Sequence, residues 1–238
     1  MKGIPAKASQ RLASNLFAVR ERMVEALAAA GRAPDAARLV AVTKSVPAEV
    51  AWALLDLGQR DLGESRPEIA LPKALALGKH DPAPVWHMIG RYQTRKIRDS
   101  LPMFTYVHSV HDLRLLERLA ARASADRELR ILLQVNVAGE AAKQGFRPDE
   151  TEAALEHAER SAKLSVQGLM TMAPAGRSSD QLRRVFADLR ILRDRLATPE
   201  RPLQELSMGM SDDFEEALRE GATLIRVGTA LYSGVLER

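Results

Sequence analysis

The chain alternates short apolar runs with longer segments in which apolar residues recur every three or four positions. The first such segment precedes every apolar run, and it ends near Gly31, with Pro34 just beyond. Its apolar residues at helical spacing are Leu12, Leu16, Val19, Met23 and Leu27. This period is typical of an amphipathic helix, and the glycine and proline mark its end. The pattern therefore predicts a leading helix within residues 1–36.

The apolar runs that follow are candidates for buried strands. They cover residues 38–43, 60–63, 85–89, 104–108, 130–137, 164–170, 203–206 and 223–227. Helical patterns lie between them, as at Leu113, Leu116 and Leu119 and again at Leu182 and Phe186. Strands that alternate with helices are typical of a parallel sheet.

Eight strands with intervening helices, in a chain of 238 residues, predict an α/β fold of the (β/α)8 or TIM barrel type, for which roughly 250 residues is typical. The alternative is an open doubly wound sheet, but no Gly-x-Gly-x-x-Gly motif follows the first strand. The loops at 78–84 and 173–179 are too short to be domain linkers. We therefore expect a single domain over residues 1–238, with 1–36 forming the leading helix and its connection.

Composition narrows the classes of function. The formal charge is +4, from 35 basic and 31 acidic residues that are interspersed, so the chain favours small anions over nucleic acid. Aromatic residues are only 4% and do not interleave with basic ones, which disfavours an RNA-binding module built on residues 91–98. The absence of cysteine excludes disulfides and thiolate catalysis. We expect a soluble cytoplasmic protein without a signal peptide, membrane partner or metal site.

Polar and flexible residues follow the predicted strands, where TIM barrels place their chemistry. The candidates are Lys44, Ser65, His87, Ser109, Asn136, Ser207, Met208, Arg226, Gly228 and Thr229. Apolar walls around Lys44 would favour the uncharged amine that attacks aldehydes. The loops after the last two strands are the usual phosphate site of this architecture. An amine, an arginine and a phosphate site together suggest pyridoxal phosphate (PLP).

Each of the main candidates also has a structural interpretation. A lysine that ends a strand is commonly a solvated turn residue, so Lys44 alone would favour a structural role. Arg226, between Ile225 and Val227, could be half of a buried ion pair. Ser207 and Thr229 could cap helices, a role that is compatible with phosphate binding.

Other polar residues leave alternatives open. His87 on an apolar strand fits a packed core histidine and an acid or base about equally well. Asn136 and Gln134 alternate along one strand, so they could form a polar layer inside the barrel or contact a cofactor. A basic cluster, consisting of Arg91, Arg95, Lys96 and Arg98, is either the solvated face of a helix or a weak anion site.

A set of motifs in fixed order makes the assignment more specific. They are Ala41-Val42-Thr43-Lys44, Gly63-Glu64, Trp86-His87-Met88-Ile89-Gly90 with Gln93 and Lys96, Val107-His108-Ser109-Val110, Gln134-Val135-Asn136, Gly139-Glu140 with Lys143 and Gly145-Phe146, Gly168-Leu169-Met170-Thr171, Leu206 to Ser211, and Thr223 to Ala230. In this order the chain, from about residue 39 to 232, resembles the YggS/PROSC family of PLP-binding proteins, also called PLP homeostasis proteins.

The resemblance implies a fold-type III barrel like the N-terminal domain of alanine racemase. It implies an internal aldimine between PLP and Lys44, and Arg226 facing the pyridine nitrogen. It also implies that Ser207, Met208, Gly228 and Thr229 surround the phosphate. Two positions depart from the family pattern, in which asparagine usually stands at the places of Ser65 and Arg95. The loss of one neutral hydrogen bond at Ser65 would weaken binding by about 0.5–1.5 kcal/mol.

The implied site disfavours enzyme chemistry. An arginine can only donate a hydrogen bond, so the ring nitrogen facing it should stay unprotonated and the cofactor should be a poor electron sink. Racemisation needs a second base, and no motif places Tyr92, Tyr106 or Tyr232 in that role; the tyrosine of alanine racemase comes from a C-terminal domain, whereas this sequence stops at Arg238. We expect no catalytic residue.

The functional hypothesis is therefore a PLP carrier or buffer. It would hold PLP reversibly on Lys44, deliver it to PLP-requiring apoenzymes, and be a monomer or weak dimer. The alternative is a slow PLP-dependent racemase with His87 or Tyr106 as an unrecognised base.

Overall fold

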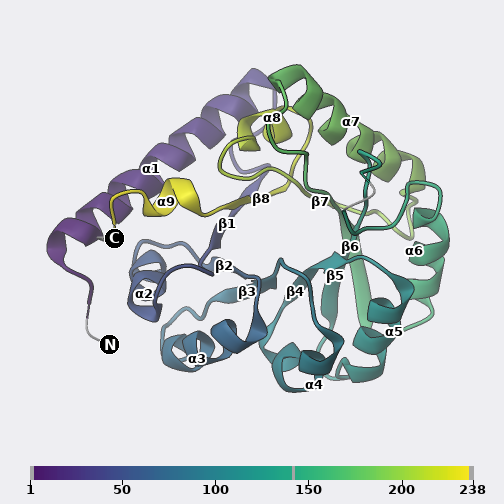
Figure 1. Ribbon diagram of the computed structural model, residues 1–238, viewed down its shortest axis with the longest axis horizontal. Coiled ribbons are helices and arrows are strands. Elements are labelled where there is room, and N and C mark those ends of the chain that lie inside the picture. The colour runs from purple at the N-terminus through teal and green to yellow at the C-terminus, as the bar shows by residue number, and fades with distance from the viewer. Residues whose placement is uncertain (1–2, 141–142, 236–238) are drawn as a thin grey trace.

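The computed structural model describes residues 3–140 and 143–235, in which the strands form a closed barrel in the order β1 to β8. The strands are β1 (Arg38–Val42), β2 (Asp61–Glu64), β3 (Val85–Met88), β4 (Tyr106–Val110), β5 (Leu129–Gln134), β6 (Leu164–Met170), β7 (Glu205–Ser207) and β8 (Leu224–Val227). Every neighbouring pair is parallel, and pairing of β1 with β8 closes the barrel (Figure 1). The predicted (β/α)8 barrel is confirmed, and the open sheet is excluded.

Helices surround the barrel (Figure 1). They are α1 (Ala6–Ala29), α2 (Ala48–Asp56), α3 (Pro67–Leu77), α4 (Ile97–Ser100), α5 (Leu113–Arg122), α6 (Thr151–Glu159), α7 (Ser179–Leu196), α8 (Phe214–Arg219) and α9 (Thr229–Tyr232). Local sequence sets some of their ends. The Asp112 side chain accepts a hydrogen bond from the Leu115 backbone N–H at the start of α5, and Ser178 and Gln181 form a capping box on α7.

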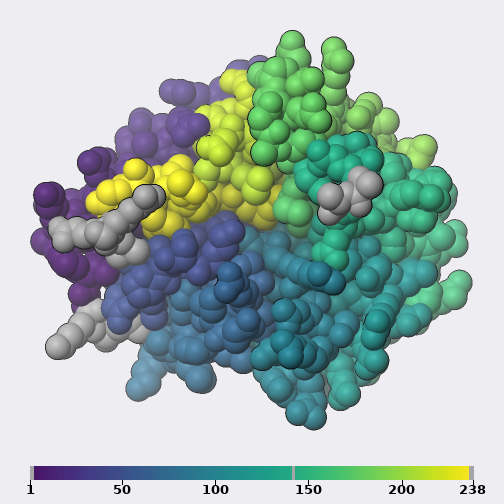
Figure 2. Space-filling view, in the orientation of Figure 1, coloured from purple at the N-terminus to yellow at the C-terminus, as the bar shows by residue number. Residues whose placement is uncertain are grey.

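The predicted leading helix, α1, completes the outer layer of helices. The helix that follows β8, α9, is a single turn, and α1 packs beside both α8 and α9 (Figures 1 and 2). Asn15 on α1 donates hydrogen bonds to the carbonyl groups of Leu231 and Ser233. The apolar face of α1, including Leu12 and Leu16, is buried. Thus α1 covers a part of the barrel that a longer eighth helix would otherwise cover.

The protein has an apolar core on each side of its strands. The larger core lies between the strands and the surrounding helices. The smaller one fills the inside of the barrel and consists of Val40, Tyr106, Leu132, Met170 and Leu224. A barrel of this size is filled by side chains rather than open, so a ligand must bind at one of its mouths.

Several strand limits differ from the predicted ones. Phe104 ends a short 3-10 turn, so β4 begins at Tyr106 instead of 104 and contains Ser109. Leu203 has a φ of 42°, which a regular strand does not allow, and β7 therefore runs from Glu205 to Ser207. The predicted strand 130–137 stops at Gln134. Apolar residues continue past these limits because the loops are buried as well.

Candidate functional site

A cavity of about 350 Å³ opens at the C-terminal mouth of the barrel. Its lining residues come from the ends of β1, β2, β3 and β8 and from the loops after β6 and β7: Val42, Lys44, Ser45, Ser65, Ile89, Gly90, Met172, Met210, Ser211, Asp212, Arg226, Gly228 and Thr229. Five residues proposed from the sequence are among them, namely Lys44, Ser65, Arg226, Gly228 and Thr229. The cavity therefore brings β1 and β8, which are far apart in the sequence, together at one rim.

The backbone in front of Lys44 is held by a buried ion pair. Lys73 on α3 lies 2.8 Å from Glu64 at the end of β2, and both side chains are almost completely buried. The Lys73 ammonium donates to the Thr43 carbonyl oxygen, and the Thr43 hydroxyl donates to Glu64 at 2.7 Å. The Lys44 residue itself is exposed at the cavity mouth. Sequence reasoning missed Lys73, which lies in a helical pattern without any motif.

Arg226 is buried and reaches the cavity from β8. Its Nη1 donates to the Ser207 hydroxyl at 2.5 Å and its Nη2 to the Thr171 carbonyl at 3.0 Å. Burial lowers the pKa of Arg226 to about 10, and the nearby Asp213 partly opposes this effect. Both hydrogen-bond acceptors are neutral oxygens, so the contacts of Arg226 differ from those of a buried ion pair. A guanidinium has five N–H donors, and two are bonded within the described part of the chain.

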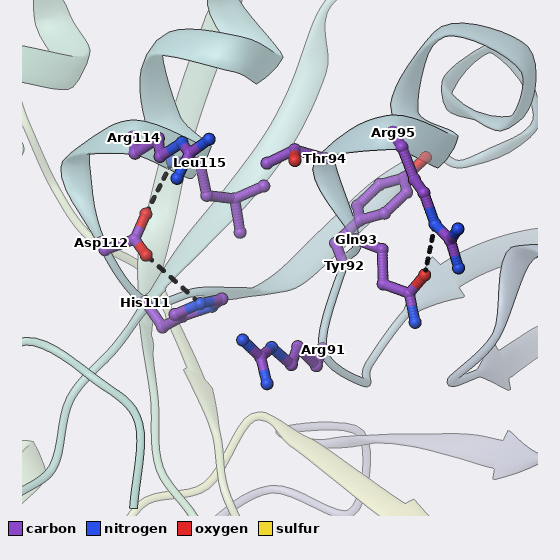
Figure 3. Close-up of a pocket in the computed structure, with 9 residues that line it drawn as sticks. All are labelled: Arg91, Tyr92, Gln93, Thr94, Arg95, His111, Asp112, Arg114 and Leu115. Atoms are coloured by element: carbon purple, nitrogen blue, oxygen red, sulfur yellow. Dashed lines mark hydrogen bonds and ion pairs between the residues drawn. The ribbon is translucent and has the colours of Figure 1, made fainter.

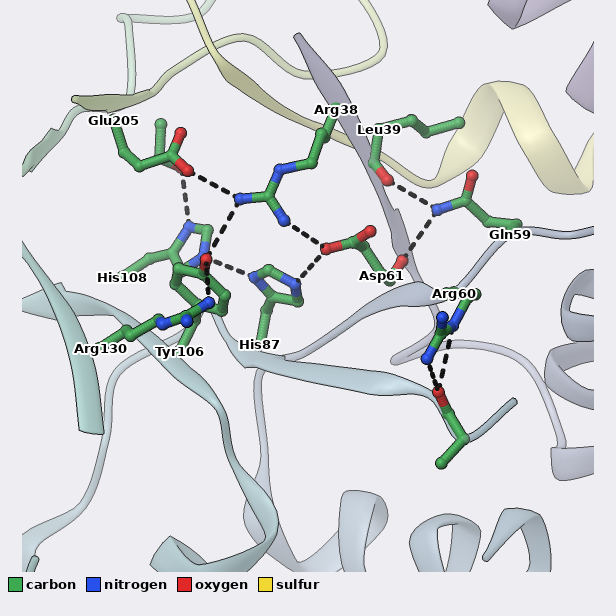
Figure 4. A network of polar contacts seen from close by, with 12 residues as sticks. Arg38, Leu39, Gln59, Arg60, Asp61, His87, Tyr106, His108, Arg130 and Glu205 are labelled. Carbon is green, nitrogen blue, oxygen red and sulfur yellow. Dashed lines mark hydrogen bonds and ion pairs between the residues drawn. The ribbon is translucent and has the colours of Figure 1, made fainter. Parts of the chain in front are cut away.

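His87 lies inside the barrel and is not among the residues that line the cavity. Its Nε2 is 2.8 Å from Asp61, at the start of β2, and its Nδ1 is 2.9 Å from His108 Nε2. Its ring stacks on Tyr106 with centroids 4.6 Å apart (Figure 4). Burial lowers the pKa of His87 below its usual value, although Asp61 opposes the shift. His87 thus belongs to a buried polar network.

Arg38 joins this network at the N-terminal end of the barrel. Its guanidinium pairs with Asp61 at 3.1 Å and with Glu205 at 2.7 Å (Figure 4). It also donates to the Tyr106 hydroxyl at 3.3 Å. The network therefore extends from β1 and β7 to the two histidines on β3 and β4.

The other proposed site residues occupy different positions. Ser109 donates to the carbonyl of Gly90, which lines the cavity, at 2.5 Å. Asn136 lies two residues beyond β5 and donates to the Glu140 carbonyl, so it closes its own loop. Met208 is fully buried in the outer core. Contacts from these residues to a ligand remain predictions.

The loops after β7 and β8 meet at the cavity. Ser211 accepts hydrogen bonds from the backbone N–H groups of Gly228 and Ala230 at 3.3 and 3.5 Å. A side chain at Gly209 would bring a Cβ to 2.7 Å from Ala217, and its φ is 91°, so the turn needs glycine. Ser211 stood in the C-terminal motif but was not proposed as a site residue. The sequence feature that could have identified Ser211 is its place four residues after Ser207, in the segment that follows β7.

A second cavity, of about 490 Å³, lies beside the first on the same rim. Arg91, Arg95 and Arg114 line it together with His111 (Figure 3). Its one lining carboxylate, within the described residues, belongs to Asp112, which accepts from the Leu115 N–H and pairs with His111 at 3.4 Å.

The basic cluster proposed from the sequence is therefore divided. Arg91 and Arg95 line the second cavity, whereas Lys96 and Arg98 do not. Arg98 is exposed and pairs with Asp99. The rim is consequently positive next to Gly90, which belongs to the first cavity.

Between residues 3 and 235, leaving aside 141–142, no group of three or more His, Cys, Asp or Glu is arranged to hold a metal ion. In the same part of the chain, no helix has the length and apolar character needed to cross a membrane.

Comparisons with known proteins agree with the geometry. A family model described as the alanine racemase N-terminal domain matches residues 14–235. The pyridoxal phosphate homeostasis protein of Pseudomonas aeruginosa is 39% identical over 222 residues, covering 93% of this chain and 94% of that protein. The protein of the same name from Aquifex aeolicus is 36% identical over 219 residues, covering 91% and 95%. The structure of PipY from Synechococcus elongatus with PLP bound has a TM-score of 0.82 and 33% identity, covering 93% of this chain and 99% of that one.

Proposed function

Because the chain belongs to the alanine racemase N-terminal domain family and, within it, to the pyridoxal phosphate homeostasis proteins, we propose that it binds PLP reversibly in the cavity beside Lys44. The observation that carries this proposal is one cavity lined by an amine, a buried arginine and a glycine-threonine turn. Its volume of about 350 Å³ is within the range of roughly 300–1,000 Å³ that small-molecule sites occupy. The donor set and the size therefore fit the cofactor.

Lys44 is the residue that we propose to hold PLP covalently. The PLP aldehyde forms a reversible imine with a primary amine and releases one water molecule. Lys44 is exposed at the mouth of the cavity, and the Lys73–Glu64 pair fixes the peptide before it. These contacts support an internal aldimine at Lys44.

Arg226 is proposed to donate a hydrogen bond to the pyridine nitrogen. The residue lines the cavity, and its contacts to Ser207 and Thr171 fix the guanidinium while leaving other N–H donors. A donor at this place disfavours protonation of the ring nitrogen, which weakens the ring as an electron sink. This supports storage of PLP over amino-acid chemistry.

The phosphate is proposed to lie at the meeting point of the loops after β7 and β8. Gly228 and Thr229 line that side of the cavity. The small residue at 228 lets the backbone approach closely, and the Thr229 hydroxyl is an available donor. The Ser207–Gly209 segment supplies the opposite loop.

We infer a role as a PLP carrier or buffer that supplies PLP-requiring apoenzymes, and not as an enzyme. The relatives at 36 and 39% identity are named for homeostasis. The two residues considered as a second base, His87 and Tyr106, are buried inside the barrel and do not line the cavity. This position counts against the alternative of a slow racemase.

The central experiment is reduction of the PLP-loaded protein with borohydride, followed by peptide mapping. We expect a pyridoxyl group on Lys44, and loss of the imine absorbance in Lys44→Ala with the fold retained. Lys79→Ala is the matched control, because Lys79 follows α3 and lies at the opposite end of the barrel. An intact imine band in Lys44→Ala would reject the assignment.

A second experiment separates carrier from enzyme. The holoprotein is incubated with amino acids in deuterated water, and exchange at Cα is followed by NMR. We expect no exchange at enzyme-like turnover. Stereospecific exchange would instead support the racemase.

A further inference from the structure

A continuous line of hydrogen bonds crosses the inside of the barrel from Arg226 to Asp61. Arg226 Nη1 is 2.5 Å from Ser207 Oγ, and Ser207 Oγ is 2.8 Å from His108 Nδ1. The line continues from His108 Nε2 to His87 Nδ1 over 2.9 Å and from His87 Nε2 to Asp61 over 2.8 Å. Both imidazoles and the Ser207 side chain are fully buried. Figure 4 shows the half that contains Asp61, His87 and His108.

The direction of every bond follows from the Asp61 end. The pKa of Asp61 is lowered overall, because the hydrogen bond from His87 and the charge of Arg38 outweigh its burial. An ionised carboxylate can only accept, so His87 Nε2 must carry a proton. Burial, aided for His108 by neighbouring positive charges, keeps the pKa of each histidine below its usual value. Each neutral ring then has one donor and one acceptor.

The remaining protons are then determined one after another. His87 Nδ1 is an acceptor, so His108 donates to it from Nε2. His108 Nδ1 is then an acceptor as well, so the Ser207 hydroxyl donates to it. Arg226 can only donate, and it uses the free lone pair of Ser207. Arg226 can only donate and the Asp61 carboxylate can only accept, so one arrangement of protons is permitted. In it, every hydrogen bond is donated in the direction from Arg226 towards Asp61.

We propose that Asp61, His87 and His108 are positioning residues that act through Ser207 to fix Arg226 towards the cofactor ring. In this arrangement the single Ser207 proton is directed to His108, and the Ser207 oxygen receives Arg226. Ser207 therefore contributes to the site by holding Arg226 and does not donate its hydroxyl proton to the phosphate. Hydrogen bonds aligned in one direction strengthen one another in a buried site. The proposal that Arg226 is fixed towards the cofactor ring rests on the proposed function, whereas the line of hydrogen bonds does not.

The first test uses the protein without PLP. The two nitrogens of each histidine are distinguished by 15N NMR at pH 7.5, with assignments from single-histidine variants. We expect His87 and His108 both to be neutral, protonated at Nε2 and unprotonated at Nδ1. An Nδ1–H tautomer or an imidazolium at either position overturns the proposed direction of the hydrogen bonds, whether or not the protein binds PLP.

The second test interrupts the line of hydrogen bonds at a residue that does not line the cavity. In His108→Leu, Ser207 and His87 lose their shared partner, and Arg226 loses its fixed position. We expect a shifted absorbance spectrum of bound PLP and about tenfold weaker binding, as for one hydrogen bond to a charged group. Tyr106→Phe is the control, because Tyr106 stacks on His87 but does not belong to the chain. Its spectrum and affinity should remain those of the wild type.

The outcomes are distinguishable. If the wild type fails to bind PLP, the proposed function fails, and the tautomers of His87 and His108 still decide whether the line of hydrogen bonds exists. If His108→Leu is folded and binds PLP with an unchanged spectrum and affinity, the positioning role is wrong and the proposed function stands. If that variant does not fold, the wild-type tautomers still test the hydrogen-bonded line. Ser207→Ala, which removes the hydroxyl between His108 and Arg226, then tests the positioning role, and an unchanged spectrum and affinity for PLP would overturn it.

Discussion

At the scale of single residues, the buried ion pair of Lys73 and Glu64 fixes the position of the peptide that precedes Lys44. Each charge has lost its water, and the pair is retained because the partners are 2.8 Å apart and also bond to Thr43. Removal of either Lys73 or Glu64 alone leaves the charge of the other without a partner in the core. The pair therefore couples the stability of the barrel to the position of Lys44.

Lys73→Met should lower the free energy of unfolding by about 3–5 kcal/mol, since it leaves the Glu64 carboxylate buried without its partner. Urea unfolding followed by circular dichroism measures the change. The double variant Lys73→Met/Glu64→Gln should recover most of the loss, because glutamine still accepts from Thr43. An equal loss in both variants would mean that the cost comes from packing.

Thr229 offers a test of the phosphate position. Thr229→Ala should remove one hydroxyl contact to a charged group and weaken PLP binding by about 1.5–3 kcal/mol. Binding of pyridoxal, which lacks the phosphate, should change little, and Thr229→Ser should behave as the wild type. Dissociation constants from absorbance titrations decide this. An equal loss for both ligands would place the phosphate elsewhere.

At the scale of elements, the outer layer of the barrel depends on α1. The helix is joined to the end of the chain by the Asn15 hydrogen bonds, by the Arg22–Glu215 ion pair and by the position of Arg22 over the Phe214 ring. Its contribution comes from the apolar face, because an exposed ion pair contributes only about 0–1 kcal/mol.

Leu16→Ala should destabilise the protein by about 2–5 kcal/mol, because a buried leucine in a packed core leaves a cavity. Phe17→Ala is the matched control on the next residue of the same helix. Phe17 is 62% exposed, whereas Leu16 is 2% exposed, so Phe17→Ala should change stability by no more than about 0.5 kcal/mol. Thermal unfolding of both variants compares the two faces. Similar losses would contradict the packing of α1.

At the scale of the whole molecule, the buried histidine pair makes the stability of the fold depend on pH. Burial lowers the pKa of both His87 and His108 in the folded protein. Below about pH 6.5 the unfolded chain binds more protons at these residues than the folded chain does. Stability is therefore complete above this pH and falls as the pH decreases. Asp61, with its lowered pKa, adds to the loss only near pH 4 and below.

Between pH 6 and 5 the free energy of unfolding should fall by up to about 2.7 kcal/mol, at about 1.4 kcal/mol per histidine and pH unit. Asp213, whose pKa burial raises, acts in the opposite direction but involves one proton against two. Urea unfolding from pH 7.5 to 5 measures the slope. It should decrease in His108→Leu and persist in His157→Gln, whose side chain is 31% exposed. A flat wild-type profile would show that the histidines titrate normally.

The order of the strands and the rim of the site could be predicted from the sequence because both follow from local patterns. Burial of a strand requires a continuous apolar run, and the C-terminal ends of parallel strands meet at one mouth. Lys44, Arg226, Gly228 and Thr229 were therefore expected on one rim, and they line one cavity there. The strand limits were less accurate, as at residues 104 and 203, because buried loops carry apolar residues too.

Only the tertiary structure decided which polar side chains meet inside the barrel. His87, His108 and Ser207 come from β3, β4 and β7, and the register between those strands brings their rings and hydroxyl within hydrogen-bond distance. Lys73 likewise reaches Thr43 from a different element. A linear pattern records which residues are apolar and how they are spaced. It does not record the stagger of one strand against another, which sets the partners of each buried polar atom.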